Sequence, residues 1–256
     1  MTEKIIILDF GSQYTQLIAR AVREAHVYCE IIPYHKQVNM TPDLKGIILS
    51  GSPFSVNDSK APDVDIKMMA DQRPVLGICY GAQLTAKNFG GRVERSDKRE
   101  YGRATLHIGK EDVLFSSVPN TSQVWMSHGD SIQETPSGFN LLATTESIPV
   151  AAFESKSVAN NIIYGLQFHP EVYHSSFGKR IIRNFLVEVC GCRQDWTPAH
   201  FITDTVAALK QQIGDRKVIM ALSGGVDSTV AATLIHRAIG DRLHGIFVDN
   251  GVLRKD

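Results

Sequence analysis

Short aliphatic runs alternate with helical patterns over the first part of the chain. Between the first two runs, residues 12–25 carry an apolar stripe at helical spacing that includes Leu17, Ala21 and Val22. The runs have the length and composition of buried strands: KIIIL (4–8), VYCEII (27–32), GIILS (46–50) and PVLGI (74–78). Alternation of this kind predicts an α/β fold, with parallel strands covered by helices on both sides.

From about residue 103 to residue 167, strand patterns follow one another with hardly any helical pattern between them. The five segments are RATLHIG, TSQVWMS, FNLLATT, PVAAFES and NIIYGLQF. They predict either an extension of the sheet, which would then be mixed, or a small separate antiparallel layer. A helical pattern at 177–191, which ends at a glycine, closes this part of the chain.

The segment CRQDWTPAH is the predicted linker to a second α/β domain. After it, Thr197 can cap a helix that has Pro198 at its first position, and Gly214 is placed to end that helix. A single βαβ unit is predicted next: a strand (217–222), a loop of small residues, a helix (227–239) and a strand (243–248). The predicted organisation is a first domain at 1–190, a linker at 191–199 and a second domain at 200–256.

Composition narrows the kind of partner. The 256 residues include 27 Lys and Arg against 27 Asp and Glu, so no overall basic field favours nucleic acid or an anionic membrane. No apolar run reaches the length of a signal peptide or a membrane span. We therefore expect small-molecule substrates and a cytoplasmic location.

The cysteine pattern indicates free thiols in a reducing compartment. The chain has four cysteines, and only Cys190 and Cys192 are close together, without a second pair that would complete a zinc site. Cys79 stands out because it follows the predicted strand 74–78 and precedes a helical pattern, with Gly77 and Gly81 on either side. Glycines here permit a tight strand-to-helix turn that exposes the side chain at a helix N-terminus.

Two interpretations of Cys79 are open from this stretch alone. It is either a nucleophile, with the N–H of Tyr80 as half of an oxyanion hole, or a small buried apolar residue. The segment GLQFHPEV favours the nucleophile, because His169 and Glu171 are two residues apart at the end of a predicted strand. This spacing lets the imidazole face the thiol while the carboxylate orients it from behind.

The combination of GICYGAQ and FHPE resembles the class I glutamine amidotransferases over about residues 1–190. The resemblance implies a doubly wound mixed sheet. It also implies hydrolysis of the glutamine side-chain amide through a γ-glutamyl thioester, with Cys79 as nucleophile, His169 as acid–base and Glu171 as its orienter. This triad requires no cofactor in that family.

The same resemblance implies further contacts to glutamine. Gln83 matches a position that contacts the substrate, and SHGDS (127–131) matches a loop that holds its amino-acid end. The candidates in this loop are Ser127, Gly129 and Asp130. The alternative for SHGDS is an ordinary turn. ILSGSPFSV (48–56) matches the loop of the second oxyanion donor, at Ser52, where relatives usually have glycine and serine tolerates fewer backbone angles.

A second motif, ALSGGVDST, lies between the last predicted strand and helix. It lacks the Gly-Lys-Ser ending of a Walker A loop, but its small residues, peptide N–H groups and hydroxyls at a helix N-terminus form an anion nest. The alternative is a plain turn with Asp227 or Ser228 as the helix cap.

This loop is similar to that of the N-type ATP pyrophosphatases, which adenylylate a substrate. The similarity implies that Asp227 helps to hold Mg²⁺ and that Val248 lies beside adenine. The implied ATP contacts are Ser223, Gly224, Gly225, Val226, Asp227, Ser228 and Val248.

A class I glutaminase ahead of such a loop resembles the GMP synthase family, as do the stretches LDFGSQYTQLIAR (8–20) and REYGRA (99–104). The resemblance implies glutamine, ATP with Mg²⁺ and XMP as substrates, GMP as product, and a homodimer for the complete enzyme. It also leads us to expect a chain truncated within the synthetase domain. Three alternatives stay open: a glutaminase serving another acceptor, a DJ-1-like cysteine hydrolase, and a catalytically silent module.

Overall fold

The computed structural model describes the backbone of residues 2–247 and the side chains of residues 2–95 and 101–247. The chain divides into two compact units, Met1–Asp195 and Trp196–Asp256. The division falls within the segment 191–199, which the sequence marks as a linker. No helix among the described residues is long and apolar enough to cross a membrane.

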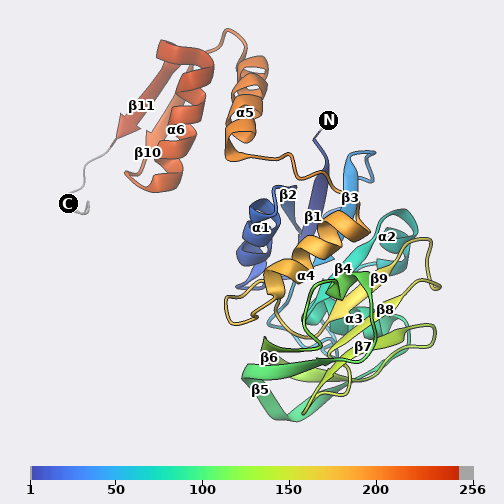
Figure 1. Cartoon of the computed structure of the whole chain (residues 1–256). Coiled ribbons are helices and arrows are strands. Elements are labelled where there is room, and N and C mark those ends of the chain that lie inside the picture. The colour runs from blue at the N-terminus through green and yellow to red at the C-terminus, as the bar shows by residue number, and fades with distance from the viewer. Residues whose placement is uncertain (1, 248–256) are drawn as a thin grey trace. The chain divides into compact units, whose positions relative to one another are not determined.

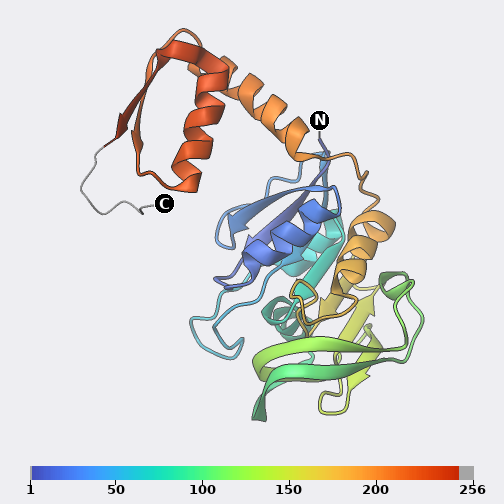
Figure 2. The same ribbon diagram turned by 60° about the vertical axis from the view of Figure 1, so that its left-hand side comes forward.

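The first unit is built on one mixed sheet, which has nine strands within the described residues, in the order β2-β1-β3-β4-β9-β8-β7-β5-β6 (Figure 1). The five strands from β2 to β9 in this order run parallel, and β8, β7, β5 and β6 continue the sheet with antiparallel pairing. The later strands therefore extend the sheet and form no separate layer; the β5–β6 pair is its edge (green in Figure 2). The strands are β1 Lys4–Asp9, β2 Tyr28–Pro33, β3 Leu44–Leu49, β4 Val75–Ile78, β5 Arg92–Ile108, β6 Thr121–Glu134, β7 Asn140–Thr145, β8 Ala152–Ser155 and β9 Ile163–Leu166.

Helices cover both faces of this sheet, as the alternating pattern predicts. In β1, Ile5 and Ile7 pack with α1 (Thr15–Glu24) and α4 (Gly178–Asn184). The intervening Ile6 and Leu8 pack on the other face with α2 (Ile66–Gln72) and α3 (Tyr80–Asn88). Successive side chains of a strand point to opposite faces, so one strand contributes to both cores.

Two local predictions need correction. Leu17 is 36% exposed, and the buried stripe of α1 is formed by Ile18, Ala21 and Val22, which are spaced three and four residues apart. The helical pattern at 177–191 forms α4 followed by a π-helical turn, η2 (Phe185–Val189), and not one continuous helix. A short 3₁₀ turn, η1 (Val113–Phe115), links β5 and β6.

The second unit contains the predicted βαβ arrangement. β10 (Val218–Leu222) and β11 (Leu243–Phe247) pair in parallel, with α6 (Val226–Ile239) and the turn η3 (Gly240–Arg242) between them. Before it, α5 (Pro198–Ile213) begins and ends where the sequence predicts. Thr197 Oγ1 accepts a hydrogen bond from His200 N at 3.2 Å, and Gly214 follows the helix with φ 59°.

Candidate active site

Two neighbouring parallel strands bring the candidate nucleophile and base together. β4 and β9 are paired, with Ile78 opposite Leu166. The N–H of Cys79 continues this ladder and donates to Leu166 O at 2.7 Å. Because the carboxyl ends of parallel strands meet at one edge of a sheet, Cys79 and the segment that carries His169 emerge side by side.

Cys79 occupies a strained turn. Its φ of 52° and ψ of −103° lie in a region that residues other than glycine rarely adopt. A methyl group on Gly77 would lie 2.5 Å from the carbonyl carbon of Gly81, and one on Gly81 would lie 2.6 Å from Leu49 Cβ. Both flanking positions therefore require glycine for strand and helix to approach this closely, which confirms the predicted elbow.

The thiol lies at the N-terminus of α3 and is 4% exposed. It donates a weak hydrogen bond to Ser127 O at 3.7 Å. Tyr80 is the first residue of the helix, so its N–H has no acceptor within the helix and is available beside the sulfur. A helix N-terminus favours negative charge on a thiolate.

The other three cysteines have a different environment. Burial raises the pKa of Cys29 to about 11 and that of Cys192 to about 12, and it also raises the pKa of Cys190 well above its ordinary value. These thiols stay protonated and inert at neutral pH. They therefore serve as internal controls for any test of thiol chemistry.

His169 is held rigidly beside Cys79 and is 2% exposed. Its Nδ1 donates to Glu171 Oε1 at 2.7 Å, which leaves Nε2 for the thiol. Burial by itself lowers the pKa of His169, but the Glu171 carboxylate, and after it Cys79, outweigh burial, so the pKa lies well above its ordinary value. The carboxylate thus stabilises the imidazolium that forms when the thiol gives up its proton.

The backbone of His169 is fixed as well. Its N–H donates to Trp125 O at 2.9 Å, and Ser175 Oγ donates to its carbonyl at 2.5 Å. β9 ends at Leu166, so His169 lies three residues beyond the strand and not at its last position.

The SHGDS segment is neither the predicted loop nor a turn, because residues 127–131 lie inside β6. The structure nevertheless brings this segment to the site. Gln83 Nε2 donates to Asp130 O at 2.6 Å, and a methyl group on Gly129 would meet no atom within 4 Å. Ser55 Oγ donates to Asp130 Oδ2, a contact that sequence patterns did not reveal.

Ser52 is accommodated without backbone strain. It is not among the residues with positive φ, and its Oγ donates to Phe10 O at 2.9 Å while accepting from Phe54 N at 3.2 Å. The serine therefore replaces glycine at a position that does not need left-handed geometry, and it ties this loop to the end of β1.

These side chains line one hollow of about 830 Å³. The predicted residues on its wall are Ser52, Cys79, Tyr80, Gln83, Ser127, Gly129, Asp130 and His169. Glu171 lies behind the histidine and does not line it. Residues that sequence reasoning missed also line it: Tyr14, Ser55, Arg95 and His128. Burial, and next the nearby His169, lower the pKa of His128 to about 4, so it is neutral at neutral pH.

The glycine- and serine-rich loop of the second unit forms a nest of peptide and hydroxyl groups. Ser223 Oγ and Ser228 Oγ are 3.1 Å apart, Gly225 N donates to Ser223 Oγ at 3.3 Å, and Gly224 has φ 77°. The N-cap of α6 is Gly225, without a side-chain cap, so neither Asp227 nor Ser228 caps the helix. Val248 lies outside the described residues.

Comparison with known proteins decides the family of the first unit. The sequence model of the class I glutamine amidotransferases matches residues 6–189. This chain belongs to the class I glutamine amidotransferases. The model of the NAD synthase family matches residues 199–254, which comprise most of the second unit.

Named relatives of this amidotransferase cover its whole length. It is 57% identical over 257 residues to the GMP synthase [glutamine-hydrolyzing] of Cytophaga hutchinsonii, and 56% identical to the GMP synthase [glutamine-hydrolyzing] 1 of Bacteroides thetaiotaomicron. Each alignment covers 100% of this chain and 50% of the relative, so the chain spans about half the length of the curated relatives it matches.

Solved structures show the same fold for the amidotransferase unit. A protein from Thermoplasma acidophilum that is assigned to GMP synthase has a TM-score of 0.61 and 30% identity, and the match covers 75% of this chain and 95% of that one. A glutamine amidotransferase from Thermotoga maritima has a TM-score of 0.60 at 18% identity, over 74% of this chain and 99% of that one.

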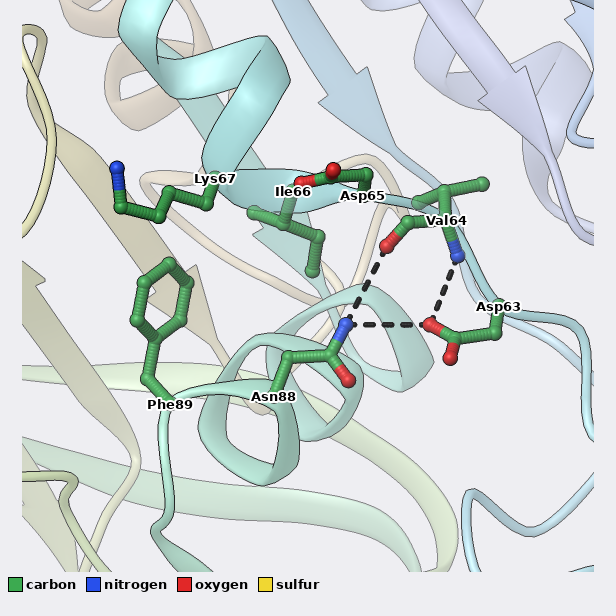
Figure 3. Close-up of a pocket in the computed structure, with 7 residues that line it drawn as sticks. All are labelled: Asp63, Val64, Asp65, Ile66, Lys67, Asn88 and Phe89. Carbon is green, nitrogen blue, oxygen red and sulfur yellow. Dashed lines mark hydrogen bonds between the residues drawn. The ribbon is translucent and has the colours of Figure 1, made fainter.

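A second hollow of the amidotransferase unit, of about 560 Å³, lies beside α2 and the end of α3 (Figure 3). Its wall carries no cysteine or histidine. Asn88 Nδ2 donates to Asp63 Oδ1 at 3.1 Å and to Val64 O at 3.3 Å, so these polar groups hold two segments of chain together. The chemistry is confined to the hollow around Cys79.

Proposed function

We propose that the first unit hydrolyses the side-chain amide of glutamine with a Cys79–His169–Glu171 triad. One observation carries this proposal: a cysteine in a strained elbow at a helix N-terminus shares a hollow with a buried histidine, whose other nitrogen is 2.7 Å from a carboxylate. Membership of the amidotransferase family supports the choice of substrate.

The proposed chemistry has two stages. His169 Nε2 takes the proton of Cys79, and the sulfur attacks the γ-carbonyl carbon of glutamine. The imidazolium then gives its proton to the leaving nitrogen, and ammonia departs from a γ-glutamyl thioester. In the second stage His169 takes a proton from water, the hydroxide attacks the thioester, and glutamate and the thiol are regenerated.

The surrounding groups have proposed roles in the same reaction. The peptide N–H groups of Ser52 and Tyr80 stabilise the oxyanion. Gln83, Ser127, Gly129 and Asp130 hold the amino-acid end of the substrate, and the Asp130 carboxylate is suited to its α-ammonium group. The hydrogen bonds from Gln83 and Ser55 keep Asp130 in place for this task.

The proposal for the second unit is that it binds ATP. The loop formed by Ser223, Gly224, Gly225, Val226, Asp227 and Ser228 offers N–H and hydroxyl donors at the N-terminus of α6, which suits phosphate oxygens. The described residues hold no cluster of three or more potential metal ligands, so Asp227 would share Mg²⁺ with the phosphates. Val248 is the proposed adenine neighbour.

The names of the relatives support one acceptor for the ammonia. The proposed overall reaction is ATP-dependent amination of XMP to GMP, with AMP, pyrophosphate and glutamate as the other products. ATP with Mg²⁺ is then required for the amination, and the triad needs no cofactor. We propose a cytoplasmic location and a homodimer for the complete enzyme.

The glutaminase proposal is tested by measuring glutamate and ammonia release for the wild type, Cys79→Ala and Cys29→Ala. We expect loss of release only in Cys79→Ala, because burial keeps Cys29 a protonated thiol. Mapping the residue modified by a thiol alkylator, with and without glutamine, should show protection of Cys79 alone. Hydrolysis retained in Cys79→Ala would end the assignment. ATP binding is tested by equilibrium dialysis with MgATP, which Asp227→Asn should weaken.

A further inference from the structure

The stretch LDFGSQYTQLIAR has no part in the triad or in the proposed substrate contacts, yet the structure places it at the active site. β1 ends at Asp9 and α1 begins at Thr15, so residues 10–14 form the connection. Asp9 Oδ1 accepts from Gly11 N at 2.9 Å and from Thr15 Oγ1 at 2.8 Å. These two bonds close the connection into a compact turn.

This turn is tied to the loop that carries Ser52. Phe10 N donates to Ser50 Oγ at 3.1 Å, and Ser52 Oγ donates back to Phe10 O at 2.9 Å. A methyl group on Gly51 would lie 3.2 Å from Ser12 Oγ and 3.4 Å from His169 Cε1. The turn, the Ser52 loop and the catalytic histidine therefore meet around Gly51.

Tyr14 makes the direct contact. Its ring is edge-to-face with the His169 imidazole, with centroids 4.9 Å apart and planes at 73°. The backbone of Tyr14 is held in place, because its N–H donates to Ser12 Oγ at 3.0 Å and its carbonyl accepts from the first turn of α1. A ring on such a rigid base can act as a wall for its neighbour.

The imidazole needs such a wall. The hydrogen bond to Glu171 fixes the position of Nδ1, but a single bond still allows the ring to tilt and so to move Nε2 away from Cys79. A misplacement of about 1 Å can cost roughly 100-fold in rate. We propose that Tyr14 is a positioning residue that packs against the His169 ring and keeps Nε2 directed at Cys79. The proposal rests on the glutaminase function proposed above.

The test compares Tyr14→Phe, which keeps the ring, with Tyr14→Leu and Tyr14→Met, which fill the space without one. Tyr34→Leu is the matched control, because Tyr34 stacks on Phe10 of the same turn at 5.5 Å and is a partly buried tyrosine as well. For each variant, steady-state glutaminase kinetics and the rate of Cys79 alkylation by iodoacetamide, mapped by mass spectrometry, are measured. Urea midpoints establish that each variant is folded.

We expect Tyr14→Leu and Tyr14→Met to lower kcat by about 10- to 100-fold with KM within about threefold of the wild type, and to slow alkylation of Cys79. Tyr14→Phe and Tyr34→Leu should behave like the wild type. The inference is overturned by an unchanged kcat in both ring-less variants. A rise in KM alone also overturns it, because Tyr14 would then be a substrate contact, as does a Phe variant as slow as Leu. If the wild type releases no ammonia, the glutaminase proposal fails, and the alkylation rates alone then decide the role of Tyr14.

Discussion

Replacing Cys79 separately by alanine and by glycine measures the strain of the elbow apart from its chemistry. Both variants lack the sulfur, and neither should hydrolyse glutamine. They differ in that glycine adopts φ 52°, ψ −103° freely, whereas alanine keeps the strain of the wild type. The free energy of unfolding should therefore respond to glycine at position 79 differently than at an ordinary position.

Ala82 provides the ordinary position, because it is fully buried in α3, within one turn of Cys79. There, an alanine-to-glycine step costs about 0.5–1 kcal/mol in chain entropy and about 0.8 kcal/mol in lost burial of a methyl group. At position 79 the same costs are offset by release of roughly 1–3 kcal/mol of backbone strain. The difference in unfolding free energy between Cys79→Gly and Cys79→Ala should thus favour glycine by about 1–3 kcal/mol more than Ala82→Gly does.

The assay is urea unfolding followed by tryptophan fluorescence. The chain has two tryptophans, and Trp196→Phe in every variant leaves Trp125, in β6, as the reporter of the first unit. Equal m-values across the set establish that the variants unfold the same surface. If the two alanine-to-glycine steps agree within about 0.5 kcal/mol, the elbow stores no strain and the interpretation of its geometry is wrong.

Two further predictions concern the groups around the thiol. Glu171→Gln keeps the shape of the side chain but removes the charge that raises the pKa of His169, so kcat for ammonia release should fall by about 10² to 10⁴, and a rate within tenfold of the wild type would contradict this role. His128 has a pKa of about 4 when folded against 6.5 for the free side chain, so the unfolded chain binds a proton that the folded chain excludes. Its contribution to stability is present above about pH 6.5 and is lost as the pH falls toward 4, a change on the order of 3 kcal/mol. His128→Gln should flatten this part of the urea-measured stability profile, and an identical slope in both proteins would refute the assignment.

Local patterns were sufficient for much of this molecule. The aliphatic runs of β1, β3 and β4 and the stop at Gly214 depend on residues close in the chain, and the structure confirms them. The elbow at Cys79 was also legible, because the glycines that permit it are its near neighbours. Leu17 was misplaced because a helical stripe read from few residues leaves its rotation undetermined by about one position.

What lay beyond the sequence was the meeting of distant segments. SHGDS carries turn-forming residues, yet it lies within β6 because pairing with β5 outweighs local preference. Tyr14, Ser55 and His128 gave no local signal of function and reached the hollow only through the order of the strands and the hydrogen bonds between loops. The chemistry-bearing types, cysteine, histidine and glutamate, announce themselves by motif and spacing. The residues that hold them in position are chosen by contacts across the sheet, and a contact between residues far apart in the chain leaves no periodic trace in either segment.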